Sequence, residues 1–314
     1  MSPPPLFFVC VGGATVDRLY RAPAALVPGT SNPVAPAQTA FGGVARNVAD
    51  NLARLGARTA LLSVVGDDEA GEALARNLDG LGIEPHLAVA PDNQTAEYVA
   101  VLQPDGDLAF GLAAMAVFDA LTPALIDAAW PTIGKASCTF ADCNLSAGTL
   151  RHLIERCRAD RFRLAVDTVS TPKALRLPED LTGVACLFTN RDEAGALLGT
   201  GDAGDEALAR GLLARGAAAA VITLGGAGAL AAYDDTLVRL PAPAADVVDV
   251  TGAGDALIAG TLLRLVGGQA LEGALRAGLC AAALTTEVGG SVRRDLSEAL
   301  LQAAEERIGS VTDL

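Results

Sequence analysis

The stretch ACLFTNRDEAGALLG, residues 185–199, decides the fold of this chain. It opens with apolar residues that predict a buried strand over 185–188. Asn190 then stands at the expected N-cap of a helix, and Glu193 three residues later completes the spacing of a capping box. The rest of the stretch, 191–199, predicts the helix itself. A buried strand that leads directly into a capped helix is the repeating unit of a parallel sheet covered by helices.

The same alternation extends to both sides of this stretch. Upstream, we predict strands at 137–141 and 163–167 with a helix at 146–159 between them. Downstream, a helix at 204–215 precedes a strand at 219–224. Strands that alternate with helices indicate an α/β fold with a doubly wound, mostly parallel sheet.

Two segments interrupt the alternation. Residues 18–40 are rich in Pro, Ala, Ser and Asn and lack a helical period, while residues 86–112 predict a β-hairpin around a turn at 104–107. We expect these two segments to form a small β-sheet lid. The large nucleotide- and substrate-binding α/β domain would then consist of residues 1–17, 41–85 and 113–314.

The composition limits the partners of the protein. The 37 acidic and 23 basic residues give a net charge of −14, which argues against nucleic acid or an anionic membrane as the main partner. No segment approaches the roughly 20 apolar residues that span a bilayer. The six cysteines form no Cys-x-x-Cys pair, which indicates buried free thiols in a reducing cytoplasm, where we expect the protein to be located.

Two common nucleotide-binding motifs are absent. Neither of the two lysines, Lys135 and Lys173, completes the Gly-Lys-Ser/Thr of a P-loop, so a phosphate site must use glycine N–H groups, arginine or a metal. The first predicted strand is followed by Gly12-Gly13 rather than by Gly-x-Gly-x-x-Gly. The chain therefore does not match a dinucleotide-binding dehydrogenase.

Residues 249–255, Asp-Val-Thr-Gly-Ala-Gly-Asp, lead into an apolar predicted helix. Gly252, Ala253 and Gly254 allow main-chain N–H groups to approach an anion, and the start of the helix adds its positive dipole end. Asp255, in the first turn, is placed to accept the proton of an attacking hydroxyl; with an ordinary aspartate pKa it would be ionised at neutral pH. A glycine turn with Asp255 as a helix-capping residue is the structural alternative, and these residues favour it slightly less.

Two more stretches lie at predicted strand ends, where α/β sheets bind ligands. Thr223, Gly225 and Gly228 follow one strand, and taken alone they also fit an ordinary turn. Asn190 and Glu193 fit a purely structural capping box, but their oxygens also suit Mg²⁺ and its waters beside nucleotide phosphates.

A fourth group lies in the first third of the chain. Asp17 follows the first predicted strand, and Gly42-Gly43 precede a helix that contains Asn47. Carboxylate and amide groups suit the vicinal hydroxyls of a sugar, because together they donate and accept hydrogen bonds. A turn and a helix cap remain the structural alternative for these residues.

These sites, in this order, resemble the ribokinase family, also called the PfkB carbohydrate kinases, over roughly residues 6 to 307. Residues 249–255 are similar to the C-terminal signature of the family, and the run from Gly42 through Asn47 to Gly56 is similar to the N-terminal one. The resemblance implies an ATP- and Mg²⁺-dependent kinase of a small hydroxylated molecule. It implies that Asp255 is the base and that Gly252, Ala253 and Gly254 form the anion hole. The implied sugar site consists of Asp17, Gly42, Gly43 and Asn47. The implied nucleotide site consists of Thr223, Gly225 and Gly228, and the implied Mg²⁺ site of Asn190 and Glu193.

The resemblance also bears on cations and on the acceptor. Family members often bind a monovalent cation beside the anion hole, which here implies a K⁺ site with contributions from Asp249 and Thr251. Val44 stands where many ribokinases carry a lysine, which argues against ribose as the acceptor.

One branch of the family, the pseudouridine kinases, is similar in further stretches. These are Ser31-Asn32-Pro33 ahead of Gly42, Asp142-Cys143-Asn144-Leu145, Asp167-Thr168-Val169-Ser170 with Lys173, and Tyr98. This resemblance implies transfer to the 5′-hydroxyl of a ribosyl group, giving pseudouridine 5′-phosphate. Ser31, Asn32 and Thr95, on the expected lid, are the candidates for reading a uracil-like base.

Two other functions compete with this prediction. The chain also fits a kinase of another sugar or nucleoside, such as ribose, fructose or an inosine-like compound. A non-catalytic nucleotide sensor on the same fold is disfavoured, because a sensor has no need of Asp255 after Gly-Ala-Gly. Finally, a β lid with one apolar face predicts that two copies pair through it as a homodimer.

Overall fold

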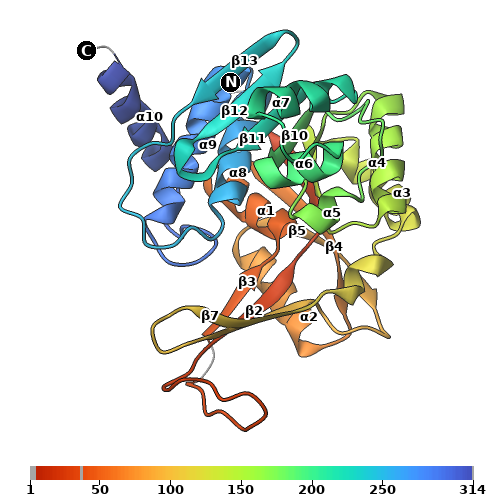
Figure 1. Cartoon of the computed structure of the whole chain (residues 1–314). Helices are drawn as coiled ribbons and strands as arrows, with labels where there is room; N and C mark the ends of the chain where they lie inside the picture. Colours follow the sequence, from red (N-terminus) through yellow and green to blue (C-terminus); the bar gives the residue numbers. More distant parts are fainter. Residues whose placement is uncertain (1–4, 36–37, 313–314) are drawn as a thin grey trace.

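The computed structural model describes residues 5–35 and 38–312 (Figure 1). Residues 1–4, 36–37 and 313–314, which belong to the expected large domain and lid, lie outside this description. The chain forms a nine-stranded sheet in the order β13-β12-β11-β10-β9-β8-β1-β4-β5 and a four-stranded sheet in the order β3-β2-β6-β7.

Most strands of the large sheet run parallel, as the alternation of strands and helices predicts. The parallel strands are β1 (Phe7–Val11), β4 (Arg58–Gly66), β5 (Ile83–Ala90), β8 (Cys138–Asp142), β9 (Leu164–Asp167), β10 (Cys186–Asn190) and β11 (Ala219–Thr223). An antiparallel pair, β12 (Ala229–Tyr233) and β13 (Thr236–Leu240), extends one edge.

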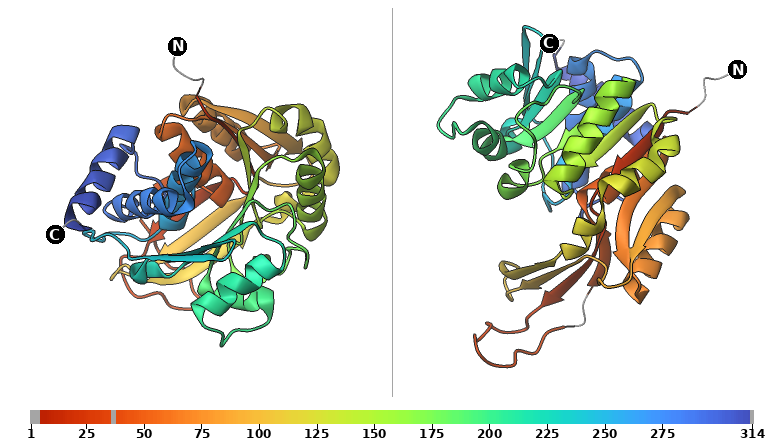
Figure 2. Two further views of the ribbon diagram at one scale, coloured as in Figure 1. Left: turned by 90° about the horizontal axis from the view of Figure 1, so that it is seen from above. Right: turned by 90° about the vertical axis from the view of Figure 1, so that its right-hand side faces the viewer.

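Helices cover both faces of this sheet (Figure 2). In β1, Phe8 and Cys10 contribute to one apolar core, while Phe7, Val9 and Val11 contribute to the other, as the two-residue period of a strand requires. The first core includes side chains of α1 (Val44–Arg54), α2 (Glu69–Gly80), α8 (Ala253–Val266) and α9 (Leu271–Thr286). The second includes α3 (Pro123–Ile133), α4 (Ala147–Asp160), α6 (Arg191–Leu198) and α7 (Asp205–Ala214). The doubly wound α/β fold is thus confirmed.

Shorter elements and the last helix complete the chain. These are two 3-10 turns, η1 (Ala116–Ala120) and η2 (Gly225–Ala227), the single-turn helix α5 (Thr171–Ala174), and α10 (Glu298–Thr312). Helix α10 packs beside α9, where Leu301 and Ala304 join Cys280, Ala281 and Leu284 in a third, smaller apolar cluster.

The small sheet projects from one end of the large domain (Figures 1 and 2). It consists of β2 (Thr15–Arg21), β3 (Gln38–Gly42), β6 (Glu97–Leu102) and β7 (Leu108–Ala114). The last two form the predicted antiparallel hairpin, and β6 pairs in parallel with β2. Alternate residues of β7, namely Leu108, Phe110 and Leu112, are exposed and give this sheet an apolar face.

One boundary of the expected lid is wrong. Residues 86–90 belong to β5, which pairs in parallel with β4 from Ile83 to Ala90 at the edge of the large sheet. An edge strand buries little of either face, and most of β5 is only partly buried. Its sequence therefore carries neither the solid apolar run of a central strand nor a clean alternation.

The structure shows the state of the cysteines and the length of the apolar helices. All six cysteines are free and buried. Within residues 5–35 and 38–312, no helix is both long enough and apolar enough to cross a bilayer.

Candidate active site

Helix α8 begins at a glycine that no other residue can replace without strain. Gly252 is the N-cap, with φ 75°, and a Cβ atom there would collide with the main chain of Ser291. The first N–H satisfied within the helix is that of Ala256, which donates to Gly252 O over 3.0 Å. The N–H groups of Gly254 and Asp255 thus point out of the helix end, where its dipole favours an anion.

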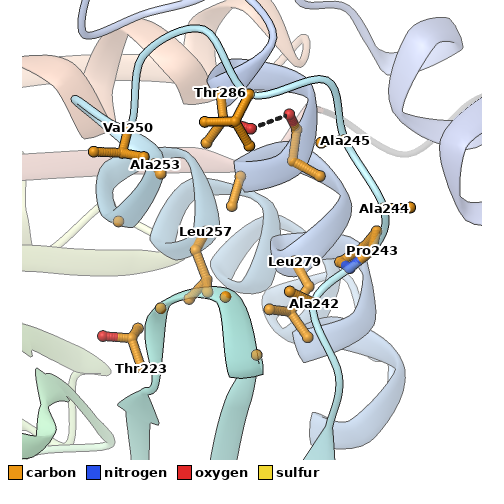
Figure 3. A pocket seen from close by; sticks show the side chains of 17 residues that line it. Thr223, Ala242, Pro243, Ala244, Ala245, Val250, Ala253, Leu257, Leu279 and Thr286 are labelled. Atoms are coloured by element: carbon orange, nitrogen blue, oxygen red, sulfur yellow. Dashed lines mark hydrogen bonds between the residues drawn. The ribbon is translucent and has the colours of Figure 1, made fainter.

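Two cavities of different character meet at this helix end. The larger, about 520 Å³, lies between α8, α9 and the 241–245 segment and has mostly apolar walls (Figure 3). Its lining includes Gly225, Gly228, Ala242, Pro243, Val250, Ala253, Leu257, Leu279 and Thr286. The smaller, about 180 Å³, is acidic, with Asp167, Glu193 and Asp255 in its walls beside Asn190. Thr223 and Gly254 line both cavities, so they mark the passage from one to the other.

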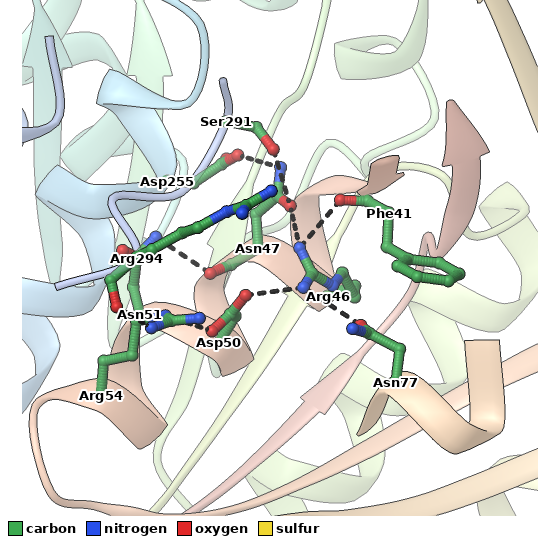
Figure 4. A network of polar contacts seen from close by, with 10 residues as sticks. All are labelled: Phe41, Arg46, Asn47, Asp50, Asn51, Arg54, Asn77, Asp255, Ser291 and Arg294. Atoms are coloured by element: carbon green, nitrogen blue, oxygen red, sulfur yellow. Dashed lines mark hydrogen bonds and ion pairs between the residues drawn. The ribbon is translucent and has the colours of Figure 1, made fainter. Parts of the chain in front are cut away.

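Asp255 lies on the first turn of α8 and faces the N-terminal third of the chain. Its Oδ2 accepts a hydrogen bond from Asn47 Nδ2 on α1 over 2.8 Å (Figure 4). Burial raises the pKa of Asp255 to about 7, although the bond from Asn47 opposes this shift. The expected ordinary pKa is therefore wrong, because the carboxyl group has lost much of its water.

Asp17, Gly42 and Gly43 gather beside this pair. The hydroxyl of Thr15 donates to Asp17 Oδ1 over 2.7 Å, and burial raises the pKa of Asp17. A Cβ atom on Gly42 would lie 2.1 Å from Asp17 Oδ2, so the glycine makes room for the carboxylate. Gly43 has φ 92°, and a Cβ atom there would lie 2.4 Å from the carbonyl oxygen of Gly13. Gly42 thus lets the chain pass close to the acid, and Gly43 lets it pass close to the main chain of Gly13.

Asn190 and Glu193 form the complete capping box at the start of α6. Glu193 N donates to Asn190 Oδ1 over 2.9 Å, and Asn190 N donates to Glu193 Oε2 over 3.1 Å. The hydroxyl of Thr168 donates to the same carboxylate. The structural interpretation of these residues is thus correct, and the two residues also line the acidic cavity.

The oxygen-rich lining of that cavity fits a hydrated divalent cation. Burial, followed by the charges of Asp255 and Glu193, raises the pKa of Asp167 well above its ordinary value. A cation would relieve this repulsion. Within the part of the chain that the structure describes, no three His, Cys, Asp or Glu side chains are close enough to hold a metal directly. Carboxylates can also hold such a cation through its waters, and Mg²⁺ at Asn190 and Glu193 stays a prediction.

Asp249 ties two loops together. Its Oδ1 accepts from Thr251 N over 2.9 Å and its Oδ2 accepts from Gly290 N over 3.0 Å. Burial opposes ionisation, but these main-chain bonds outweigh it and lower the pKa of Asp249. The loop contacts account for this carboxylate without a bound ion, and the K⁺ site at Asp249 and Thr251 stays a prediction.

Three expected acceptor-binding residues lie apart from the Asp255 site. The side chain of Asn32 makes hydrogen bonds within its own loop. Its Oδ1 accepts from Val27 N over 2.8 Å, and its Nδ2 donates to Val27 O over 3.0 Å. Ser31 is exposed on the same loop. Thr95 is buried; its hydroxyl accepts from Gly66 N over 3.0 Å and donates to Asp68 over 2.6 Å. The expectation that Thr95 faces the acceptor is not met, because its hydroxyl is engaged in the turn after β4.

Asp142 has a structural role that its sequence position did not reveal. This fully buried carboxylate accepts from the N–H groups of Gly13, Ala45 and Asn144, each over 2.9 Å. It joins the end of β1 to the start of α1, and Lys173 Nζ donates to the neighbouring Asn144 Oδ1 over 2.6 Å. Burial raises the pKa of Asp142. An acid that ends an apolar strand was the only sequence signal for this role.

Comparison with known proteins places this site in a family. The chain matches the family described as pfkB family carbohydrate kinase over residues 6–297. It is 31% identical to the pseudouridine kinase of Escherichia coli K12 over 260 residues, which cover 81% of this chain and 82% of that one. It is 33% identical over 303 residues to the bifunctional protein HldE of Caulobacter vibrioides, covering 88% of this chain and 60% of HldE.

A solved structure agrees with both sheets. A carbohydrate kinase from Agrobacterium tumefaciens superimposes with a TM-score of 0.86 at 32% identity, covering 96% of this chain and 97% of that one. The coverage leaves little of either chain outside the superposition, so the likeness is not confined to one part of the fold. This chain therefore belongs to the PfkB family of carbohydrate kinases.

Proposed function

We propose that this protein transfers the terminal phosphoryl group of ATP to the 5′-hydroxyl of a ribosyl group, with pseudouridine as the acceptor. The observation that carries the chemistry is the position of Asp255: it stands at the N-terminal end of α8, in the acidic cavity that adjoins the apolar one. A base, a dipole end and a cavity of nucleotide size meet at this point.

The larger cavity suits the adenosine part of ATP. Its walls are mostly apolar side chains from α8, α9 and the 241–245 segment, as expected for a purine site. Gly225 and Gly228, with φ 57° and 95°, let the turn after β11 bend close to it. The phosphates would then pass Thr223 and Gly254 to reach the end of α8.

The transfer step follows from this arrangement. The acceptor oxygen attacks the γ-phosphorus while its proton passes to the Asp255 carboxylate. The bond from the γ-phosphorus to the β–γ bridging oxygen breaks, and ADP leaves with that electron pair. The N–H groups of Gly254 and Asp255 stabilise the charge that develops on the transferring group.

Asn190 and Glu193 would hold the Mg²⁺ that accompanies ATP through its waters. The cation supplies positive charge to the phosphates and offsets the acidic cavity. Because Glu193 is fixed by Asn190 N and by Thr168, its carboxylate is already oriented before nucleotide binds.

Asp17 and Asn47 would hold the ribosyl hydroxyls. The acceptor proposal is supported by the 31% identity with a pseudouridine kinase and by the resemblance of the Ser31-Asn32-Pro33 stretch to that branch of the family. A similar identity, 33%, with HldE means that identity alone does not select the acceptor. A kinase of another sugar or nucleoside is therefore the second candidate, and it uses the same Asp255 chemistry.

The test is a kinase assay with ATP and Mg²⁺ across pseudouridine, uridine, inosine, ribose and fructose. We expect the highest kcat/KM with pseudouridine, with phosphate on the 5′-oxygen. Equal or better turnover of ribose or fructose would overturn the acceptor. Asp255→Asn should bind ATP but lose phosphoryl transfer by several orders of magnitude. Undiminished transfer in this variant would remove Asp255 from the mechanism. If the wild type transferred phosphate to none of the acceptors, a non-catalytic nucleotide sensor would be favoured.

We further propose that two copies pair through the apolar face of the small sheet. Leu108, Phe110 and Leu112 are each at least half exposed, at 56%, 51% and 60%, on one face of β7. Such a contiguous apolar surface favours a partner surface of its own kind. Light scattering should give twice the chain mass, and Phe110→Glu should return it to the monomer value.

A further inference from the structure

Arg46 is a buried cation in the N-terminal signature that the proposed reaction leaves without a role. It lies on the first turn of α1, between the glycine pair and Asn47, and only 4% of its surface is exposed. Burying a guanidinium is costly unless its N–H groups find partners, so its contacts indicate what it does.

Each terminal nitrogen of Arg46 makes two hydrogen bonds, whereas the buried Nε has no hydrogen-bond partner in the part of the chain that the structure describes (Figure 4). Nη1 donates to Phe41 O over 2.9 Å and to Asn47 Oδ1 over 3.0 Å. Nη2 donates to Asp50 Oδ2 over 2.6 Å and to Asn77 Oδ1 over 3.2 Å. The partners come from β3, α1 and α2, so the guanidinium plane is fixed from three directions.

This fixed plane determines the orientation of the Asn47 amide. A guanidinium carries donors only, so the Asn47 atom that faces it must be the amide oxygen. The hydroxyl of Ser291 donates to the same oxygen over 3.4 Å. The NH₂ group of Asn47 is consequently turned away from both donors, and there its Nδ2 lies 2.8 Å from Asp255 Oδ2.

The orientation matters because the two ends of an amide act oppositely on a carboxylate. An N–H donor stabilises the ionised form, whereas a facing carbonyl oxygen would favour the protonated form. We propose that Arg46 is a positioning residue that acts through Asn47: it holds the amide with its NH₂ toward Asp255, so that the base is oriented and ionised when the acceptor arrives. This inference rests on the proposed role of Asp255. In agreement with it, the bond from Asn47 and the charge of Arg46 both lower the pKa of Asp255, whereas burial and the charge of Asp142 raise it. Asp167 and Glu193 line the same cavity, and neither is altered in the variants compared below.

The chain offers a matched control on the same helix. Arg54 Nε donates to Asp50 Oδ1 over 2.7 Å, so it shares the ion-pair partner of Arg46. It also donates to the carbonyl oxygen of Arg294, and among the described residues it makes no hydrogen bond to Asn47. Arg46→Lys and Arg54→Lys therefore make the same chemical change to one ion-pair network, and only the first disturbs the amide. Lysine keeps the positive charge in both cases but cannot form the planar fork.

The experiment compares the pH dependence of kcat/KM for the wild type and both variants, each first shown to be folded by its thermal melt. We expect Arg46→Lys to move the acidic limb upward by about half a pH unit or more, a loss of ~3-fold near pH 6.5 that disappears near pH 8.5. Arg54→Lys should follow the wild type. Arg46→Gln also removes the charge that lowers the pKa of Asp255, so it should shift the limb further in the same direction, and Arg46→Lys is the variant that isolates positioning.

A second background separates positioning from a general structural effect. In Asn47→Ala the amide is gone, so Arg46→Lys should cause no further shift of the acidic limb. A shift that persists in this background, or overlapping profiles for Arg46→Lys and Arg54→Lys, would overturn the proposal. Failure of the underlying function is recognised separately, because Asp255→Asn would then retain phosphoryl transfer.

Discussion

The main chain of Gly252 lies so close to the carbonyl oxygen of Ser291 that a Cβ atom on Gly252 would be 1.9 Å from it. Gly252 also has φ 75°, a conformation that other residues adopt only with strain. Gly252→Ala should therefore displace the first turn of α8, and with it the N–H groups that face the transferring phosphoryl group. We expect kcat to fall by ~100-fold or more, the usual cost of losing such donors, in a steady-state assay with saturating ATP.

Gly254 provides the control for this substitution. It is only two residues away, its φ is ordinary, and no atom lies within 4 Å of an added Cβ. Gly254→Ala should keep the wild-type melting temperature and act mainly on the KM for ATP, because the methyl group would enter the passage between the two cavities. Equal losses of kcat in both variants would contradict the role given to the helix start.

The central strands and this helix start could be predicted because local sequence determines them. The apolar run of β1 predicts a buried strand, and the glycines before Asp255 predict a helix start with free N–H groups. The sequence of edge strand β5 does not predict a strand of the large sheet, because only one of its residues is fully buried and its apolar and polar residues do not alternate regularly. The hydrogen bonds of Thr95 and Arg46 could not be predicted either, since their partners are fixed by tertiary packing: Arg46 meets Asn77, 31 residues along the chain, only after α1 and α2 have packed on the sheet.

The pH dependence of transfer should report the environment of Asp255. Burial raises its pKa to about 7, and only the ionised carboxylate accepts a proton. The rate should therefore rise as the pH rises through about 7 and fall ~10-fold for each unit below it. The kcat/KM profile measures this group in the free enzyme. A rate that stays flat down to pH 5 would contradict the assignment of Asp255 as base.

The same shift predicts that Asp255 lowers the stability of the fold at neutral pH. The folded protein binds this proton more tightly than the unfolded chain, so the stability of the wild type falls as the pH rises from the ordinary aspartate range to about 7. Asp255→Asn has no such dependence and still offers an oxygen to Asn47. It should be more stable than the wild type at pH 8, by on the order of 2 kcal/mol at most, with a narrower gap at pH 5. Calorimetry at the two pH values measures the difference, and an equal gap at both would refute the explanation.

Thr95 should matter for folding rather than for acceptor choice. Thr95→Val keeps the shape of the side chain but leaves Gly66 N without its acceptor and removes the hydroxyl bond to Asp68, while the main-chain bond from Thr95 N to Asp68 remains. We expect a loss of ~1–3 kcal/mol in the free energy of unfolding, measured by urea denaturation. The ratio of kcat/KM for pseudouridine to that for ribose should not change.

Ser31→Ala is the comparison for acceptor choice. Ser31 is exposed on the lid loop, so its loss should leave stability within about 0.5 kcal/mol of the wild type. If Ser31 reads the base, the same ratio falls in this variant. A changed ratio in Thr95→Val with unchanged stability would instead restore Thr95 to the acceptor site.

Glu193 allows the capping role and the metal role to be separated. Glu193→Gln keeps an oxygen for the N–H of Asn190, as capping boxes with glutamine do, but removes the negative charge from the acidic cavity. The melting temperature should change little, while the Mg²⁺ concentration for half-maximal activity should rise, because a neutral amide holds the hydrated cation less well. Asp192→Asn removes the same charge from the neighbouring, exposed position and should leave the Mg²⁺ dependence as in the wild type. Titrating Mg²⁺ at fixed ATP in the three proteins measures this difference. Overlapping curves would reduce Glu193 to its part in the capping box, and the hydrated cation would then have to be held by Asn190, Asp167 and the phosphates.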